Sequence, residues 1–284
     1  MLELKNISKY YNAGTVNEMC LFNDFNLSID DGEFVSVVGS NGSGKTSMLN
    51  LICGSIPVDS GTIVMGGTDI TKMPEYKRQR RIGRVYQHPA MGTCPNMTIL
   101  ENMALADNKG KPFNLLPGTN KARIDFYRDQ LKILGLGLED KMGVKVGVLS
   151  GGQRQAMALL MSTMTPIEFL ILDEHTAALD PKTADIIMEL TGKIVAEKHL
   201  TTIMVTHNLR FAVEYGNRLL MMHQGMRSWI RKARKRRTRR WMISLTCLTR
   251  SVLNAATNAH LARTLVTVYI FARVRIIGTL VPFM

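Results

Sequence analysis

The segment FVSVVGSNGSGKT, residues 34–46, determines most of what this chain's sequence predicts. Its first part, Phe34 to Val38, is short, rich in valine and apolar on both faces, which is typical of a strand buried within a parallel sheet. The next eight residues fit the pattern G-x-x-x-x-G-K-[ST], and a helix is expected from about Lys45. A buried strand, a glycine-rich loop and a helix in this order predict an α/β fold with a phosphate-binding loop.

Each residue type in this loop suits anion binding. Glycines let backbone N–H groups turn inward toward phosphate oxygens, and the following helix directs its positive end at the same anion. The ammonium group of Lys45 would bind the β- and γ-phosphates of a nucleotide, and the hydroxyl of Thr46 would bind Mg²⁺. Lys45 is therefore also a catalytic candidate and Thr46 a metal ligand. The predicted nucleotide-binding residues are Gly39, Ser40, Asn41, Gly42, Ser43, Gly44, Lys45 and Thr46.

Strand and helix patterns elsewhere complete the predicted architecture. Alternating apolar residues in Leu2–Ile7 and Leu21–Ile29 predict an N-terminal antiparallel β subdomain. Two apolar runs, Phe169–Leu172 and Thr202–Val205, predict further buried strands with a helix between them. Residues from about 88 to 165 have a helical pattern. We therefore expect a mostly parallel core sheet that carries a helical insertion.

The strand that begins at Phe169 ends in two carboxylates, Asp173 and Glu174. Nucleotides bind at the carboxyl ends of the strands in open α/β sheets, where Asp173 could hold Mg²⁺ through water. Glu174 could act as general base toward the attacking water. An acidic pair after a strand is more often a solvated strand end. The phosphate loop on the same sheet favours the catalytic interpretation and an α/β P-loop ATPase.

A second anion-binding helix end is predicted at LSGGQ, residues 149–153. Ser150 is a favoured N-cap residue, and the two glycines after it allow a phosphate to approach the helix N-terminus. One chain cannot direct both helix ends at one nucleotide if they lie on opposite sides of the domain, whereas two chains arranged head to tail can. The predicted nucleotide-binding residues here are Ser150, Gly151, Gly152 and Gln153.

Taken together, these motifs resemble those of the ABC transporter ATPases, over roughly residues 1–227. Residues 39–46 match the family's Walker A motif, residues 149–153 its signature and residues 173–174 its Walker B motif. The family's other motifs are matched by single residues, and each of these residues, taken alone, could instead have a surface or core role. The resemblance implies that Gln87 is the catalytic Q-loop residue that senses Mg²⁺ and the permease, and that His207 is the catalytic switch histidine at the γ-phosphate. It also implies that Asp180 is the nucleotide-binding D-loop aspartate and that Tyr11 is the aromatic residue that stacks on adenine.

The resemblance also implies a mechanism and a setting. Two ATP molecules with Mg²⁺ would lie between two subunits, which form a homodimer or a pair with another ATPase subunit. Each ATP would be held by the phosphate loop of one chain and the signature of the other. Closure would move an integral membrane permease from the cytoplasmic face of the membrane, and hydrolysis would reopen the dimer. Residues 135–140 and 173–183 are similar to bacterial uptake ATPases of the group associated with tryptophan- or tyrosine-like substrates. That group implies a separate solute-binding protein.

Two other protein classes share these motifs, namely DNA-acting and ribosome-bound ATPases. Repair and chromosome members insert a long coiled coil between phosphate loop and signature, whereas the 105 residues from Lys45 to Ser150 carry no sustained heptads. Ribosome-bound members normally carry two ATPase domains, and only one phosphate loop is present here. The transporter is favoured over the alternative, an ATPase that acts on nucleic acid with a basic arm.

The net charge of +13 is concentrated at the C-terminal end. Residues 1–227 carry 24 basic and 23 acidic side chains, whereas residues 228–284 carry 12 basic and no acidic ones. We expect an ATPase domain over 1–227 and a poorly ordered basic tail over 228–284, since the tail cannot pair its own charges. The tail could bind nucleic acid or anionic lipid, or could be a solvated extension without a partner.

A third explanation of the tail is a shift of reading frame near residue 228. With synonymous codons chosen freely, residues 228–258 in the neighbouring frame can encode LDKKGKKEKNKKMDDLLDMFNEISIECGN followed by a stop. That string contains a charged turn and an amphipathic acidic helix, as the C-terminal end of the family would. The hypothesis explains why the family resemblance stops abruptly after Arg227.

Other features bear on location. The opening residues lack the basic and then apolar run of a signal peptide, and the most apolar segment, Leu265–Ile277, is interrupted by Arg273 and Arg275. We therefore expect the protein to lie outside the bilayer. The four cysteines have no metal-ligand spacing, which predicts reduced thiols.

Overall fold

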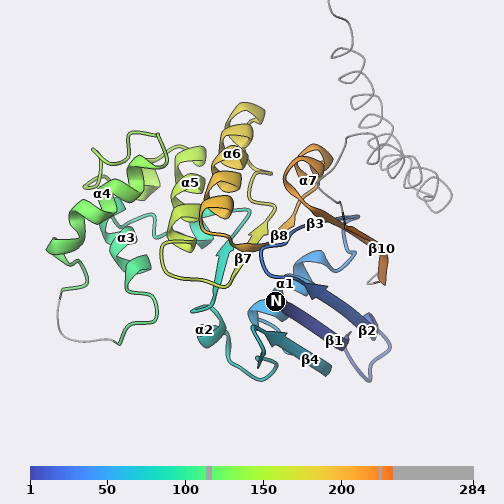
Figure 1. Ribbon diagram of the computed structural model, residues 1–284. Helices are drawn as coiled ribbons and strands as arrows, with labels where there is room; N and C mark the ends of the chain where they lie inside the picture. The colour runs from blue at the N-terminus through green and yellow to red at the C-terminus, as the bar shows by residue number, and fades with distance from the viewer. Residues whose placement is uncertain (113–116, 224–225, 233–284) are drawn as a thin grey trace, which may run out of the picture.

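The computed structural model describes residues 1–112, 117–223 and 226–232, which form two sheets and the helices around them (Figure 1). The smaller sheet is antiparallel, has the strand order β2-β1-β4-β5 and lies next to the N-terminus. Its strands are β1 (Leu2–Tyr11), β2 (Met19–Ile29), β4 (Ser60–Met65) and β5 (Thr68–Asp69). The predicted N-terminal antiparallel subdomain is thus confirmed.

The larger sheet has the order β10-β9-β3-β8-β7-β6, and the five strands from β9 to β6 run parallel. Strand β8 lies between β3, which leads into the glycine-rich loop, and β7, which ends in the carboxylate pair. The carboxyl ends of three strands that carry predicted site residues are therefore neighbours. The strands are β3 (Phe34–Gly39), β6 (Ile82–Val85), β7 (Phe169–Asp173), β8 (Thr201–Val205), β9 (Arg218–His223) and β10 (Met226–Lys232).

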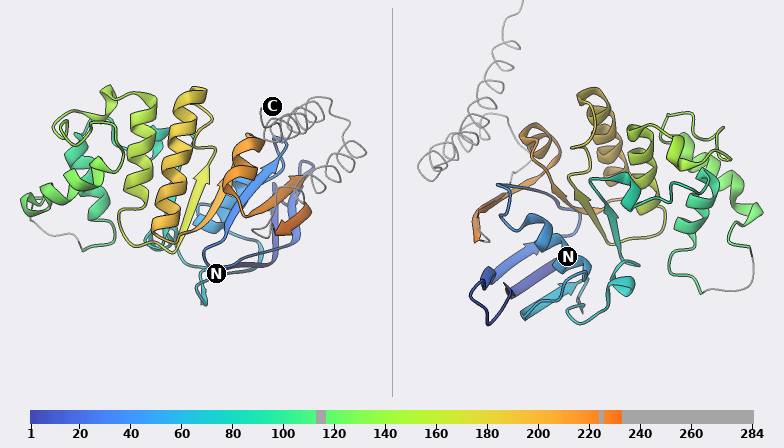
Figure 2. Two further views of the ribbon diagram at one scale, coloured as in Figure 1. Left: turned by 45° about the horizontal axis from the view of Figure 1, so that its top comes forward. Right: turned by 180° about the vertical axis from the view of Figure 1, so that it is seen from behind.

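Helices cover both faces of the parallel sheet. Helix α1 packs with the antiparallel sheet on one face, and α5 and α6 lie side by side on the other (Figures 1 and 2). Helices α3 and α4 lie at the end of the molecule far from the antiparallel sheet. The helices are α1 (Lys45–Cys53), α2 (Glu75–Arg78), α3 (Ile99–Asp107), α4 (Ile124–Lys132), α5 (Gly151–Ser162), α6 (Pro181–Glu197) and α7 (Leu209–Tyr215).

Side-chain alternation along the central strands explains why both faces are covered. In β7, Phe169 and Ile171 pack with α1 and the antiparallel sheet, whereas Leu170 and Leu172 pack with α5 and α6. All five residues of this strand are buried. An apolar strand of this kind is stable only between two layers, so the α/β prediction with a mostly parallel core sheet and a helical insertion is confirmed.

Buried Arg78 in α2 fixes the far end of the helix that follows the glycine-rich loop. Its Nη1 donates to the carbonyl oxygens of Leu51 and Ile52 at 2.8 and 3.1 Å, and Nε and Nη2 donate to those of Met73 and Thr71 at 2.8 Å each. The two Nη1 bonds satisfy carbonyl groups in the last turn of α1, where intrahelical partners are lacking. Arg78 therefore anchors the C-terminal end of α1.

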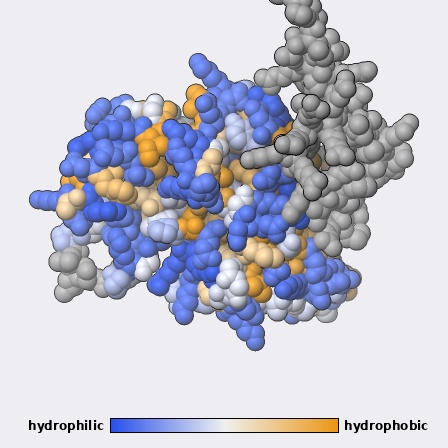
Figure 3. All heavy atoms as spheres, in the orientation of Figure 1, coloured by the Kyte–Doolittle hydropathy of each residue, from blue (hydrophilic) through white to orange (hydrophobic). Residues whose placement is uncertain are grey.

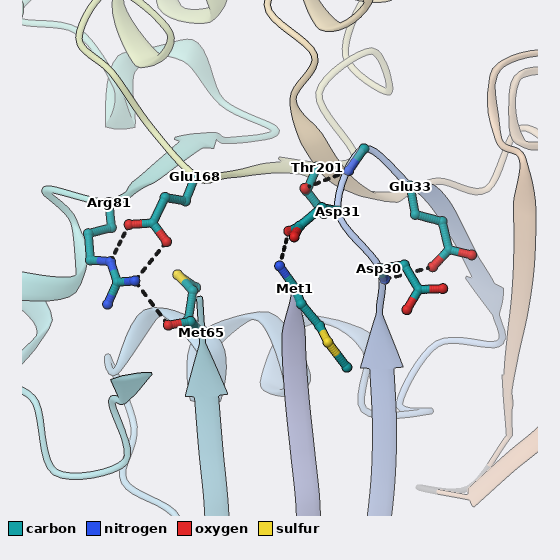
Figure 4. Close-up of polar contacts among 9 residues, drawn as sticks. Met1, Asp30, Asp31, Glu33, Met65, Arg81, Glu168 and Thr201 are labelled. Atoms are coloured by element: carbon teal, nitrogen blue, oxygen red, sulfur yellow. Dashed lines mark hydrogen bonds and ion pairs between the residues drawn. The ribbon is translucent and has the colours of Figure 1, made fainter. Parts of the chain in front are cut away.

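The amino ends of the parallel strands are joined to the antiparallel sheet by polar contacts (Figure 4). Arg81, just before β6, forms an ion pair with Glu168, just before β7, and donates to the carbonyl oxygen of Met65 in β4 at 2.9 Å. The amino group of Met1 contacts Asp31, and these residues lie near the start of β1 and just before β3. This edge therefore holds the two sheets together, and the opposite edge carries the loops with the predicted site residues.

The predicted domain boundary at residue 227 stays a prediction. Strand β10, Met226–Lys232, crosses that position and pairs antiparallel with β9. Most of the predicted basic tail, residues 233–284, lies outside the described residues. Among the residues that are described, no helix is long and apolar enough to cross a membrane. The face seen in Figure 3 is largely hydrophilic, with small scattered hydrophobic areas.

Candidate functional site

Two glycines shape the loop between β3 and α1. A Cβ on Gly39 would lie 2.3 Å from the carbonyl oxygen of Met222, a backbone atom that cannot move aside easily. Gly44 is the N-cap of α1 and has φ 92°, in the left-handed region that glycine adopts without strain. A Cβ there would also lie 3.0 Å from the ring of Phe22. Both positions therefore require glycine, as the loop pattern predicts.

Lys45 begins α1 and turns its ammonium group back over the loop. Its Nζ donates to the carbonyl oxygens of Gly39 and Ser40, at 2.9 Å each. Burial lowers the pKa of this amine, and the nearby carboxylates of Glu174 and Asp173 act in the opposite direction. An ammonium group has three N–H donors, so one remains for a further acceptor such as a phosphate oxygen.

The hydroxyl of Ser43 provides a test of whether the loop fits a phosphate. Its Oγ is fully buried and has no hydrogen-bond partner among the described residues. Buried polar atoms are almost always paired, so this hydroxyl requires a partner. A phosphate oxygen within the loop would be a suitable acceptor for it, which is what an anion-binding loop requires.

Asp173, the last residue of β7, is nearly buried. Its Oδ2 lies 2.8 Å from Nη2 of Arg84 in β6, and its Oδ1 makes no hydrogen bond or ion pair with the described residues. Thr46, a second predicted ligand of Mg²⁺, lies in the first turn of α1 and is exposed. In the described part of the chain, no group of three or more His, Cys, Asp or Glu side chains could hold a metal. A site with so few protein ligands is compatible with Mg²⁺, because this ion is usually bound by one or two carboxylates together with substrate phosphates.

Glu174 lies directly after β7 in an unusual backbone conformation. Its φ is 48°, in the left-handed region that non-glycine residues rarely adopt. Its N–H donates to the carbonyl oxygen of Val205 in β8 at 3.0 Å, which ties the turn to the neighbouring strand. Residues held in such conformations cluster at functional sites, so this geometry supports a catalytic role for Glu174.

His207 follows β8 and meets Glu174. Its Nε2 lies 2.8 Å from Oε1 of Glu174, and the imidazole is about half exposed. Because β8 lies between β3 and β7, His207 extends from the strand between the phosphate loop and the carboxylate pair. The structure therefore brings Lys45, Asp173, Glu174 and His207 to one edge of the parallel sheet.

Gln87 lies at the same edge but is exposed. Strand β6 pairs with β7, with Val85 opposite Leu172, so Gln87 and Glu174 both lie two residues beyond this pair. The carbonyl oxygen of Tyr86, just before Gln87, accepts a hydrogen bond from Nε2 of buried Gln155 in α5 at 3.1 Å. Gln87 is thus placed where a metal or nucleotide contact is feasible, and its role stays a prediction.

The signature segment forms the capped N-terminus of α5. The Oγ of Ser150 accepts from the N–H of Gln153 at 3.2 Å, and the side chain of Gln153 accepts from the N–H of Ser150 at 3.1 Å. A Cβ on Gly152 would lie 2.4 Å from the methyl carbon of Thr183, so a side chain would collide with α6. In the described residues, no hydrogen bond or ion pair connects this segment to the phosphate loop.

Two further predicted residues have structural contacts of their own. Asp180 is the N-cap of α6 and accepts a hydrogen bond from the N–H of Thr183 at 3.1 Å, and bonding to Thr183 lowers the pKa of its carboxyl group. Tyr11 ends β1, packs partly buried against the core and has Nζ of Lys9 at 5.7 Å from its ring centroid. Neither contact tests the predicted nucleotide-binding role, so both roles stay predictions.

Two residues in this region were missed by the sequence analysis. Arg84 is almost fully buried although it lies in an apolar strand, and a lone arginine between Gly83 and Val85 is a signal that could have found it. His175 directly follows Glu174 and is completely buried, with Nε2 3.3 Å from Oγ1 of Thr191 in α6. Burial lowers the pKa of His175 to about 4. The sequence alone does not distinguish this neutral core histidine from a catalytic one.

Comparison with known proteins shows the family of the chain. Residues 22–177 match the family described as "ABC transporter". The chain is 48% identical over 225 residues to the tyrosine transport ATP-binding protein of Clostridioides difficile, covering 79% of this chain and 89% of that protein. It is 32% identical over 226 residues to a probable ABC transporter ATP-binding protein of Campylobacter jejuni, covering 79% and 88% of the two chains.

A solved structure shares the fold. It is a dimeric ATP-binding cassette in a post-hydrolysis state, bound to ADP and Pi, with 30% sequence identity and a TM-score of 0.71. The match covers 83% of this chain and all of that one. Because the family match, the relatives and the fold agree, the chain belongs to the ABC transporter family, as an ATP-binding subunit built on an ATP-hydrolysing cassette.

Proposed function

We propose that this chain is the motor subunit of a solute importer and that two copies, or this chain and a paired ATPase subunit, bind and hydrolyse ATP between them. The observation that carries the proposal is the 2.8 Å contact between Nε2 of His207 and Oε1 of Glu174, at the edge of the sheet where Lys45 and Asp173 also lie. A cation that can bind phosphates, a carboxylate base and a neighbouring imidazole are groups that suit phosphoryl transfer to water.

The residues of the site divide the chemistry between them. Loop residues 39–46 bind the phosphates, with Lys45 and the Ser43 hydroxyl as the side-chain donors, and Glu174 orients and deprotonates the attacking water. His207 holds Glu174 and contacts the transferred phosphoryl group. Thr46, Asp173 and Gln87 would hold Mg²⁺, which neutralises charge on the phosphates when it is bound. Tyr11 would stack on the adenine ring.

The second half of each site comes from the other subunit. Ser150, Gly151, Gly152 and Gln153 form a capped helix N-terminus with no polar connection to the phosphate loop of the same chain among the described residues. Such an end binds anions, so we assign it to the nucleotide of the partner subunit, together with Asp180. The dimeric cassette of similar fold supports this arrangement.

Relatives support an assignment of cargo and setting. The Clostridioides difficile relative is named for tyrosine transport, and another relative, in Haemophilus influenzae, for spermidine and putrescine import. At 48% identity the first is the better guide, so we propose a tyrosine-like amino acid as cargo. The chain would act at the cytoplasmic face of the membrane with an integral permease and a separate solute-binding protein.

Hydrolysis by the purified chain tests the motor assignment. We expect Mg²⁺-dependent ATP hydrolysis that Lys45→Met reduces at least 100-fold, because the variant loses the buried cation of the loop. Lys77→Met, at an exposed position in α2, is the control and should hydrolyse ATP normally. Full activity in Lys45→Met would contradict the proposed site. Stimulation by tyrosine in vesicles that contain the permease and the solute-binding protein would test the cargo.

A further inference from the structure

A buried arginine on the edge strand β6 connects the elements that carry the site. Nη2 of Arg84 lies 2.8 Å from Oδ2 of Asp173 in β7, and Nη1 donates to Oδ1 of Asn50 in α1 at 2.9 Å. The guanidinium carbon lies 4.6 Å from the ring centroid of Tyr86, the residue before Gln87. One side chain thus contacts the helix after the phosphate loop, the strand with the metal-binding carboxylate and the segment that leads to Gln87.

Asp173 is the anionic partner of this guanidinium. The thiol of Cys53 also lies near Arg84, but burial raises its pKa to about 11, so the thiol is neutral at pH 7. The side chains of Arg84 and Asp173 are only 6% and 13% exposed. A charge-assisted bond between buried groups is short and directional, so it restricts how the carboxylate can rotate.

We propose that Arg84 is a positioning residue for metal binding, which holds the carboxylate of Asp173 by Oδ2 so that Oδ1 is presented to Mg²⁺. The proposal rests on the role of Asp173 in the proposed function. Without Arg84 the carboxylate would be a nearly buried charge lacking its ion-pair partner, which is strongly unfavourable. Lys45, whose charge already interacts with Asp173, would then compete for the carboxylate.

The same two strands offer a matched control. Arg81, just before β6, pairs with Glu168, just before β7, with Nη2 2.7 Å from Oε2 (Figure 4). This pair joins β6 and β7 as Arg84 and Asp173 do, but at the amino edge of the sheet, away from the phosphate loop. Arg81→Met therefore removes an arginine–carboxylate pair between the same two strands, a more exposed one, without touching the proposed metal site.

The test is a Mg²⁺ titration of nucleotide-dependent stabilisation. The Tm of the purified chain is measured with saturating ATP, first in EDTA and then at rising Mg²⁺ concentration. We expect Arg84→Met to raise the Mg²⁺ concentration for half-maximal stabilisation at least 10-fold and to leave the shift with ATP and EDTA unchanged. Arg81→Met should stay within about 2-fold of the wild type. Arg84→Lys, which keeps the charge but not the planar fork, should fall between the two.

Each outcome decides between two explanations. If Arg84→Met lowers the Tm of the protein alone but leaves the Mg²⁺ midpoint at the wild-type value, Arg84 is only structural and the proposal is wrong. If the wild type itself shows no Mg²⁺ dependence, the metal site of the proposed function fails, and the role of Arg84 fails with it. If Arg84→Met does not fold, Arg84→Lys and Asn50→Ala must both raise the midpoint, and an unchanged midpoint in these two overturns the proposal.

Discussion

Nε2 of His207 lies 2.8 Å from Oε1 of Glu174. The two residues follow the neighbouring strands β8 and β7, whose backbones hold them in place. Glu174 has a φ of 48°, and its N–H bonds to the carbonyl oxygen of Val205, the last residue of β8. His207 follows Val205 by two residues. The pair is therefore positioned by the ends of two adjacent strands.

This relationship predicts a kinetic defect on loss of the imidazole. We expect His207→Ala to lower kcat for ATP by about 100-fold or more, in the range that positioned acid–base groups contribute. The affinity for ATP should change little, because the loop and Lys45 remain. The measurements are kcat under saturating ATP and Kd in equilibrium binding. A large loss of affinity with unchanged kcat would instead make His207 a ground-state ligand.

Buried His175 predicts a dependence of stability on pH. Its folded pKa of about 4 lies below the ordinary value of 6.5, so between these values the unfolded chain binds a proton that the folded chain does not. The free energy of unfolding should therefore fall as pH drops from 6.5 to 4, by about 3 kcal/mol for this group. Denaturant unfolding at pH 7 and pH 4 measures the loss.

His175→Gln keeps a polar group beside Thr191 and removes the titration. It should lose about 3 kcal/mol less than the wild type between the two pH values. His199→Gln, at an exposed position after α6, is the control and should behave as the wild type does. Equal acid sensitivity of His175→Gln and the wild type would show that His175 is not the group responsible.

The basic tail leads to a prediction about truncation. Because β10 pairs with β9 through Lys232, the chain should be shortened after that residue. If residues from about 228 onward arise from a shifted reading frame, the protein truncated after Lys232 should fold and hydrolyse ATP as the full chain does. A nucleic-acid arm predicts salt-dependent binding of DNA or RNA that truncation abolishes. Sequencing the gene decides the origin, since the frame-shift hypothesis requires an acidic helix and a stop near the codon for Asn258 in the neighbouring frame.

Local patterns allowed most of the parallel sheet and its loops to be predicted. The apolar runs of β3, β7 and β8 and the pattern of residues 39–46 depend on neighbours in the sequence, which a single chain displays. Asp173 and Glu174 could be proposed as site residues because a strand end fixes where they lie relative to the loop. The signature was recognised from its residues, and its capping box follows from Ser150 and Gln153 at a spacing of three.

Contacts between distant segments could not be predicted. Arg84 meets Asp173 and Asn50 only because β6 pairs with β7 and α1 packs on that face. Arg78 caps α1 from a different helix, and the 2.8 Å contact of His207 with Glu174 depends on the strand order β3-β8-β7. Such arrangements arise from tertiary packing, which one sequence without relatives does not reveal.

The most direct test of the account is whether ATP drives two chains together through the signature. Sedimentation of Glu174→Gln with ATP should show a stable dimer, because the nucleotide site remains while water activation is lost. Adding Ser150→Arg to this variant should leave ATP binding by the monomer intact and abolish the dimer, since we assign Ser150 to the partner's nucleotide. A monomer in Glu174→Gln with ATP, or loss of monomer ATP binding on Ser150→Arg, would contradict the two-chain site.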